Sequence, residues 1–187
     1  PLSKMILAQI EDEGGHEHAS LIGAEGKTST AQAALYNGSA GHALDYDDVL
    51  GIFTGHPTVA VMPAVLALAE RHGKSGQDVI TAFVAGVEVL ARIGGMMSKG
   101  HYARGWHSTG TIGSIGAAAA CANLLGLDAE GTNRAMGIAA TQAAGLKSNF
   151  GTMTKPLHAG KAASNGLLAA SLASRGFTSR ENTLDIA

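Results

Sequence analysis

The segment HALDYDD, which begins at His42, concentrates ionisable side chains in a chain that is otherwise poor in them, since charged residues make up 15% of its 187 residues. If the segment ends a helix, its spacing places His42, Asp45 and Tyr46 on one helix face. Asp47 and Asp48 complete the acidic run. Carboxylates at a helix C-terminus oppose the helix dipole, so local stability does not explain them. We therefore interpret the segment as part of a functional site.

Three cation-capable side chains stand where helices are expected to begin. They are His56 in GHP, His107 in GWHSTGT and Lys155 in TKP, where Thr154 is expected to cap the helix. Backbone amides at helix N-termini bind anions. If these helix starts meet the acidic segment, the pocket would hold carboxylates while a histidine moves a proton and an aspartate orients it. His158, which lies just beyond Lys155, is expected to shape the pocket.

Other chemical interpretations carry less weight. An aspartate-rich helix can bind magnesium and diphosphate, but such sites use a second acidic motif, and the sequence has no comparable cluster. GAEGKTST and HGKSG resemble the lysine end of a phosphate-binding loop but lack its first glycine. His16 and His18 lie in a glycine-led loop and are interpreted as solvated. We predict no metal ion and no organic cofactor.

Capping residues and apolar runs predict an all-α domain of six helices with no strand. The helices are expected over residues 28–48, 57–72, 79–97, 108–127, 129–145 and 156–176, with a glycine-broken loop at 99–107. Pro57 fits a first helical turn and Asp128 a cap. Gly110, Gly113 and Gly116 recur every third residue, and we interpret them as a stripe for close contact with another helix.

The overall composition excludes several classes of function. The net charge of −2 does not suit nucleic-acid binding, which needs clustered basic residues. Cys121 is the single cysteine and is expected to be a buried thiol in a reducing compartment. No signal peptide is apparent, and no continuous apolar run reaches the roughly 20 residues of a membrane span. We expect a cytoplasmic protein without a membrane partner.

Four motifs together are similar to the MmgE/PrpD family, which includes 2-methylcitrate dehydratases, cis-aconitate decarboxylase and iminodisuccinate epimerase. They are NGSAGHALDYDD, GHPTVAVMPAVLALAE, GWHSTGTIGSIGAAAA and MTKPLHAGKAA, and they occur in the family order. The resemblance implies an all-helical domain with a substrate pocket, no required cofactor and commonly a homodimer. Complete members add an α+β lid. We therefore expect residues 1–187 to be a single helical domain of a longer enzyme, without the family's opening helix and lid.

The resemblance also assigns residues and a reaction. It places the first aspartate of the acidic motif on Asp45, the two histidines on His56 and His107, and the lysine on Lys155. Asp47 and Asp48 match the same motif as supporting residues, and His42, Thr154 and His158 complete the expected substrate site.

The expected function is a cofactor-independent enzyme on a small di- or tricarboxylate, with proton transfer at a carbon next to a carboxylate. Lys155 would hold a carboxylate, His107 or His56 would carry the proton, and Asp45 would orient the substrate. Dehydration of the 2-methylcitrate type is favoured, because members acting on cis-aconitate have a threonine where this chain has Val49. GHYARGWH and NFGTMTKP resemble the epimerase members, so epimerisation is the alternative. A noncatalytic helical module that binds an anion or a partner is the rival outside enzymes.

Overall fold

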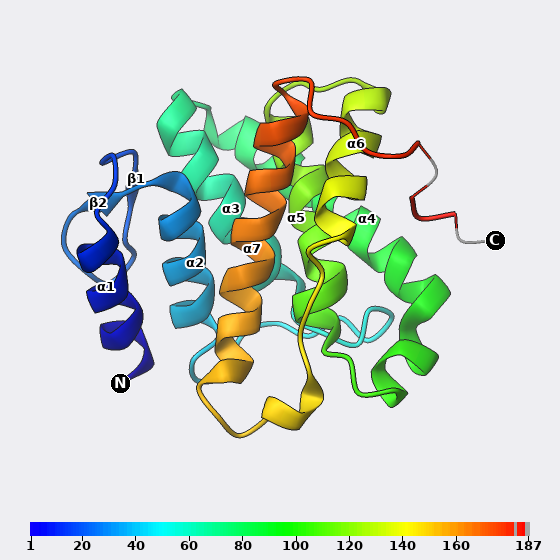
Figure 1. The fold of residues 1–187 in the computed structure, drawn as a ribbon, viewed down its shortest axis with the longest axis horizontal. Helices are drawn as coiled ribbons and strands as arrows, with labels where there is room; N and C mark the ends of the chain where they lie inside the picture. The colour runs from blue at the N-terminus through cyan, green and yellow to red at the C-terminus, as the bar shows by residue number, and fades with distance from the viewer. Residues whose placement is uncertain (182, 186–187) are drawn as a thin grey trace.

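The computed structural model describes residues 1–181 and 183–185, without the side chains of residues 98 and 99. Figure 1 shows helices packed along one another and a small hairpin beside them, which confirms the all-α fold. The helices are α1 (Leu2–Glu13), α2 (Thr30–Gly41), α3 (Pro57–His72), α4 (Gly76–Ala103), α5 (Ser108–Leu124), α6 (Ala129–Ala140) and α7 (Thr154–Ala173), with a short 3-10 turn, η1 (Lys147–Asn149). Strands β1 (Ala19–Ser20) and β2 (Lys27–Thr28) pair antiparallel.

Local capping signals account for most helix ends. Pro57 opens α3, and Gly73 ends it in the left-handed conformation. Ser75 and Asp78 form a reciprocal capping box at the start of α4, and the Asp128 side chain accepts the Gly131 amide at α6.

Five sequence expectations about the elements are wrong. Helix α1 and the β1–β2 hairpin lie before residue 29, where the sequence predicted no element. Helix α2 stops at Gly41, so HALDYDD is a turn, because Asp45 has φ 58° and a right-handed helix excludes that conformation. Helix α4 continues to Ala103, into the loop expected at residues 99–107, and the Lys147 ammonium binds the Tyr102 carbonyl oxygen at its end. Helix α6 stops at Ala140 and not at residue 145.

Helix α5 forms the centre of the bundle and packs against α3, α4, α6 and α7. A Cβ atom at Gly113 would lie 2.8 Å from the Ala60 side chain of α3, and one at Gly116 would lie 2.8 Å from Leu90 of α4. The predicted glycine stripe therefore allows close helix contact, but with more than one helix, because each step of three residues rotates around α5. Cys121 is fully buried, and burial raises its pKa to about 12.

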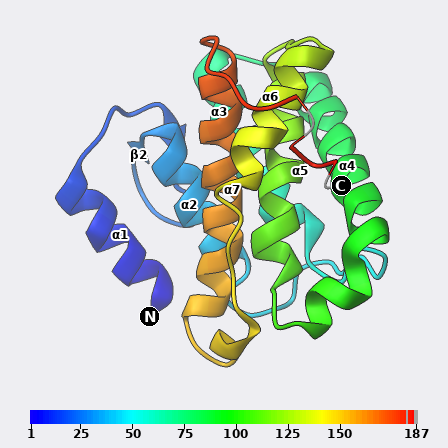
Figure 2. The ribbon, with the colours of Figure 1, turned by 45° about the vertical axis from the view of Figure 1, so that its right-hand side comes forward.

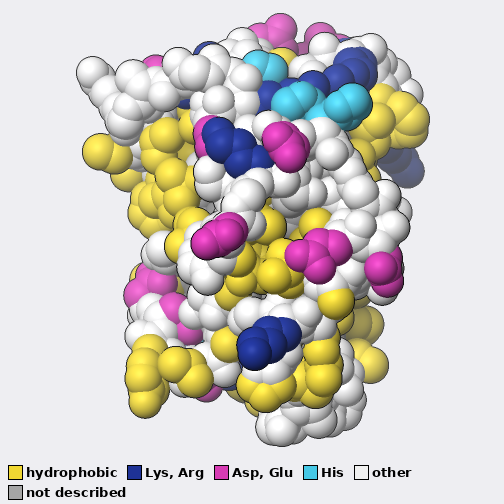
Figure 3. All heavy atoms as spheres, turned by 90° about the vertical axis from the view of Figure 1, so that its left-hand side faces the viewer, with side chains coloured by type: hydrophobic (Ala, Val, Ile, Leu, Met, Phe, Trp, Pro, Cys, Tyr) yellow, Lys and Arg dark blue, Asp and Glu magenta, His cyan; other side chains and the backbone are white. Residues whose placement is uncertain are grey.

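The hairpin and α1 form a satellite on the side of α2. Ile10, Leu21 and Tyr36 make a small apolar cluster there. Figure 3 shows hydrophobic side chains between scattered charged groups on this face. The Glu70 carboxylate ties the hairpin to α3, since it accepts from the Ser20 amide at 2.7 Å and pairs with Lys27 at 2.6 Å.

Helix α4 lies on the opposite side of the bundle from α1 (Figure 2). The stretch Gly76–Met97 of this helix has a mean hydropathy of 1.7, so by length and composition alone it could cross a membrane. This stretch was not singled out from the sequence, because polar residues interrupt its apolar run. A core helix of a soluble protein passes the same test, and 28% of this stretch is buried here. The inner face packs on α3 and α5, while Ile80 and Val84 are 64% and 59% exposed.

Candidate active site

Four helix ends meet at the lower end of the bundle in Figure 1. His42 is the residue after α2, His56 and His107 are the residues before α3 and α5, and Lys155 lies in the first turn of α7. Close approach of α2 and α7 brings these ends together, because a Cβ at Gly38 would lie 2.8 Å from the Gly160 Cα. The convergence of helix starts and acidic segment is therefore observed in the fold.

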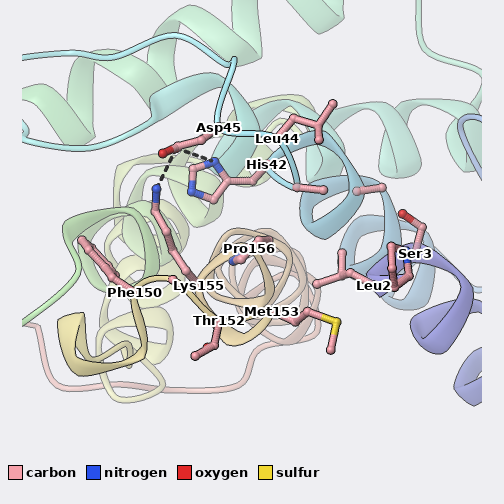
Figure 4. Close-up of a pocket in the computed structure, with 14 residues that line it drawn as sticks. Leu2, Ser3, His42, Leu44, Asp45, Phe150, Thr152, Met153, Lys155 and Pro156 are labelled. Atoms are coloured by element: carbon pink, nitrogen blue, oxygen red, sulfur yellow. Dashed lines mark ion pairs between the residues drawn. The ribbon is translucent and has the colours of Figure 1, made fainter.

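Asp45 and Lys155 form the charged centre of the cluster (Figure 4). The Lys155 Nζ lies 2.7 Å from Asp45 Oδ1, and this contact holds the pKa of Asp45 below its ordinary value, although partial burial opposes the effect. Asp45 Oδ1 also lies 3.5 Å from His56 Nε2 and 3.8 Å from His42 Nδ1. The left-handed backbone at Asp45 costs on the order of 1–3 kcal/mol in a non-glycine residue, and such strain is typical of functional sites.

Asp47 contacts the same two histidines. The fully buried His42 has its Nδ1 at 2.9 Å from both carboxylate oxygens of Asp47, and His56 Nδ1 lies 3.2 Å from Oδ2. Burial alone would raise the pKa of Asp47, but the contacts with the two imidazoles outweigh it and hold this pKa well below the ordinary range. The same carboxylate raises the pKa of His56, against the burial that would lower it. Asp47 therefore favours the protonated form of His56.

His107 has the opposite electrostatic environment. It is 2% exposed, and burial, followed by the neighbouring His158, lowers its pKa to about 3. Its Nδ1 lies 3.0 Å from His158 Nδ1, and its ring contacts the Phe150 ring edge-on, with centroids 4.8 Å apart. His107 is thus neutral near pH 7, whereas the environment of His56 favours a proton.

A cavity of about 800 Å³ opens beside these groups, a size that suits a small ligand. Figure 4 shows Asp45, Lys155 and Phe150 on one side of it and Leu2 and Ser3 of α1 on the other. The unpredicted helix α1 is therefore part of the cavity wall. A second hollow of about 200 Å³ is lined by His56, His107, Lys155, Phe150, Tyr102 and Val49, among others.

Three lining residues were not assigned a site role from the sequence. Phe150 borders both cavities, and the Lys155 Nζ lies 5.3 Å from its ring centroid. Tyr102 borders the smaller hollow and carries Lys147 over its ring at 3.7 Å. Leu2 lines the larger one. Phe150 could have been found, because aromatic residues are only 4% of the chain and Phe150 lies in the conspicuous segment NFGTMTKP.

Two expected site residues lie differently. Asp48 Oδ2 accepts a hydrogen bond from the Thr58 hydroxyl at 2.9 Å, so it ties the acidic turn to α3. The predicted cap by Thr154 is wrong, since α7 begins at Thr154 and the residue before it, Met153, makes no side-chain cap. The Thr154 amide instead donates to Thr152 Oγ1 at 3.2 Å, because the turn before α7 folds back on itself.

One group of side chains has the composition of a metal site. Donor atoms of His42, Asp45, Asp47 and His56 lie within 4.8 Å of one another. Imidazole and carboxylate together suit several divalent metals. The Lys155 ammonium, at 2.7 Å from Asp45, places a fixed positive charge at the edge of this group and would repel a cation bound there. The prediction that no metal is needed stays a prediction.

The fold and the cluster define a helical domain with a cavity beside a group of histidines, aspartates and one lysine. The chain belongs to the MmgE/PrpD family, because residues 1–186 match the model of the MmgE/PrpD N-terminal domain. This confirms the family indicated by the four motifs.

Curated relatives include the cis-aconitate decarboxylase-like protein oryM of Aspergillus oryzae, which is 36% identical over 99% of this chain and 40% of its own length. The human cis-aconitate decarboxylase is 37% identical over 82% of the chain and 33% of its own length. The Aspergillus terreus cis-aconitate decarboxylase is 37% identical over 88% of the chain and 35% of its own length. The chain thus spans about a third to two fifths of the relatives it matches.

Proposed function

We propose that the complete natural protein is a lyase that acts on a small di- or tricarboxylate by moving a proton at a carbon next to a carboxylate. The observation that carries this proposal is the contact of Lys155 with Asp45, beside His42 and His56. A lysine at a helix start binds a substrate carboxylate and stabilises the negative charge that develops on it when the neighbouring carbon loses a proton. The names of the relatives support a lyase.

The opposite environments of His107 and His56 suggest their roles. His107 is neutral near pH 7, because burial lowers its pKa to about 3, so one ring nitrogen has a lone pair for the carbon-bound proton. Such a pKa makes a weak base, so the transfer needs Lys155, which lines the same hollow, to stabilise the charge left on the substrate. His56 has a raised pKa, because Asp47 lies beside it, so it is suited to donate a proton to a leaving hydroxyl group. In a dehydration, the C–H electron pair forms the new double bond, and the C–O bond breaks with release of water.

Dehydration of a hydroxy-tricarboxylate of the 2-methylcitrate type is the outcome we propose. Val49 supports it, since it borders the same hollow as His56, His107 and Lys155 and is 69% exposed. The family resemblance expects a threonine at this position in members that act on cis-aconitate. A branched apolar side chain there removes a hydroxyl group that could contact the substrate.

Decarboxylation of cis-aconitate is the second candidate, because the curated relatives carry that name at 36–37% identity. The same groups would serve it: Lys155 would stabilise the electron pair left by carbon dioxide, and a histidine would return a proton to carbon. Replacement of Val49 by threonine should then increase the rate of carbon dioxide release relative to dehydration. An unchanged ratio of the two rates would refute the role of Val49 in choosing the reaction.

The test is a panel of small carboxylates incubated with the complete protein in deuterated water. Formation of an unsaturated product from a hydroxy acid, with deuterium exchange at carbon, supports dehydration. Release of carbon dioxide from cis-aconitate supports the second candidate, and exchange with inversion alone supports epimerisation. Binding seen by thermal shift without exchange at any carbon would refute enzymatic function and favour a noncatalytic anion-binding module.

A further inference from the structure

His107 and His158 form a buried pair of imidazoles that the proposed reaction uses only in part. Their Nδ1 atoms lie 3.0 Å apart, and the residues come from the start of α5 and the first turns of α7. A hydrogen bond between two neutral imidazoles requires that one nitrogen carry the proton and the other offer its lone pair. The protonation states of the two rings are therefore coupled.

The backbone around the pair is shaped to allow this contact. A Cβ atom at Gly110 would lie 3.1 Å from the His158 Cβ and 2.5 Å from the Ala144 carbonyl oxygen. Gly145 has φ 143°, and a Cβ atom built on it would lie 3.4 Å from the His158 ring and 3.5 Å from the His107 Cβ. The Gly145 carbonyl oxygen accepts a hydrogen bond from the His107 amide at 3.0 Å. A side chain at Gly110 would crowd the His158 Cβ and the Ala144 carbonyl oxygen. At Gly145 the contacts would be ordinary, but its φ of 143° strains any residue other than glycine, so both glycines suit the backbone around the pair.

The groups that face His107 make a positive charge on it unfavourable. Lys155, His42, His56 and His158 all oppose its protonation, and its burial opposes protonation most. His158 is 9% exposed, compared with 2% for His107, so a positive charge on His158 retains more contact with water. Burial lowers the pKa of His158 as well, so the Nδ1 contact offers a proton a path outward when neither ring keeps a positive charge.

We propose that His158 is a proton acceptor that acts through His107, so that the two imidazoles form a relay. This inference rests on the proposed function of His107 as the base. As His107 Nε2 takes the proton from the substrate carbon, the Nδ1 proton of His107 moves to His158 Nδ1. His158 then loses its Nε2 proton to water. Each ring ends as a neutral imidazole of the other tautomer, and return of both rings to the starting tautomers completes the cycle.

A first experiment tests the pair without any substrate. Nitrogen-15 NMR of histidine-labelled complete protein reports which ring nitrogens carry protons. The relay requires His107 protonated at Nδ1 and His158 unprotonated there in the resting protein, and His158→Asn must change the His107 nitrogen signals. Nδ1-protonated His158 in the resting protein would overturn the proposal.

A second experiment separates relay from positioning by kinetics. In His158→Asn, the amide oxygen can still accept from His107 Nδ1 but cannot take its proton. We expect kcat to fall about 100-fold, with KM within about twofold, since general acid–base groups contribute on the order of 10²–10⁴ in rate. His158→Ala should lose a similar factor, whereas wild-type kcat in His158→Asn would overturn the relay. His72→Asn, at the far end of α3 from His56, is the matched control and should keep wild-type kcat.

The two experiments distinguish a failed relay from a failed function. If no carboxylate in the panel exchanges deuterium in the wild-type protein, the proposed function is refuted, and the NMR result alone decides whether the imidazole pair shares its proton as required. If the wild-type protein turns over and His158→Asn does so equally well, the function stands and the relay is refuted. Circular dichroism and thermal unfolding of each variant show that loss of rate does not come from loss of fold.

Discussion

Replacement of Lys155 by alanine tests the centre of the proposed site. Lys155 Nζ lies 2.7 Å from Asp45 Oδ1, and its side chain is 16% exposed at the start of α7. The substitution removes the fixed positive charge but leaves the helix start and the histidines in place. Asp45 loses the largest cause of its lowered pKa, so its pKa should rise toward the ordinary value.

The expected magnitudes differ for activity and for stability. Loss of a preorganised group that stabilises developing negative charge costs on the order of 10²–10³ in kcat. The Asp45 side chain is 54% exposed, so water screens the ion pair, and such pairs contribute about 0–1 kcal/mol to the free energy of unfolding. We therefore expect Lys155→Ala to lose at least about 100-fold in kcat and no more than about 1 kcal/mol in stability.

The assay combines initial rates on the responsive carboxylate with urea unfolding. Lys27→Ala is the matched control, because Lys27 pairs with Glu70 at 2.6 Å on the hairpin, away from the cavity beside Lys155. It should change stability by a similar small amount and leave kcat unchanged. Wild-type turnover in Lys155→Ala would refute the assignment of Lys155, and equal losses of rate in both variants would show that the effect is general.

Two further predictions concern pH and packing. Because Asp47 raises the pKa of His56, Asp47→Asn should shift the alkaline limb of the kcat/KM profile to lower pH. Protonation of His56 also stabilises the fold. This contribution is full below about pH 6.5, the ordinary pKa of histidine, and is lost as the pH rises through the raised pKa of His56. An unmoved alkaline limb in the pH–rate profile would contradict the role of His56. Gly160→Ala should destabilise by about 3 kcal/mol in urea unfolding, because a methyl group would overlap the Leu35 carbonyl oxygen. Gly76→Ala, with nothing within 4 Å, should change stability by less than about 0.5 kcal/mol, and equal effects would refute the close α2–α7 contact.

Short-range signals predicted most helices well. Pro57 and Gly73 bound α3, and Asp128 caps α6, because each acts through its own backbone conformation or a hydrogen bond within one turn. The end of α4 was harder to predict locally, since the Lys147 ammonium, one of the groups that bind the Tyr102 carbonyl oxygen there, is 45 residues away in the sequence. Helix α1 was not predicted; its Ile10 packs in the satellite cluster, and its Leu2 lines the larger cavity.

The types of chemical group at the site were visible in the sequence. Lys155 before a proline, His56 and His107 before helical runs, and the acidic segment after α2 all follow from local patterns that hold in any fold. Their roles relative to one another were not visible. Whether a histidine faces a carboxylate, as His56 does, or another imidazole, as His107 does, depends on which helix ends meet.

Only the tertiary structure decided that arrangement. Glycine contacts between α2 and α7 set the distance from Asp45 to Lys155, and contacts of α5 with α7 set the pairing of His107 with His158. Burial then moves the pKa of His107 down, while Asp47 moves that of His56 up. These shifts depend on distance and on exclusion of water, which neighbouring residues in the sequence do not determine. The sequence determined which groups are present and where helices begin, and packing determined what each group can do.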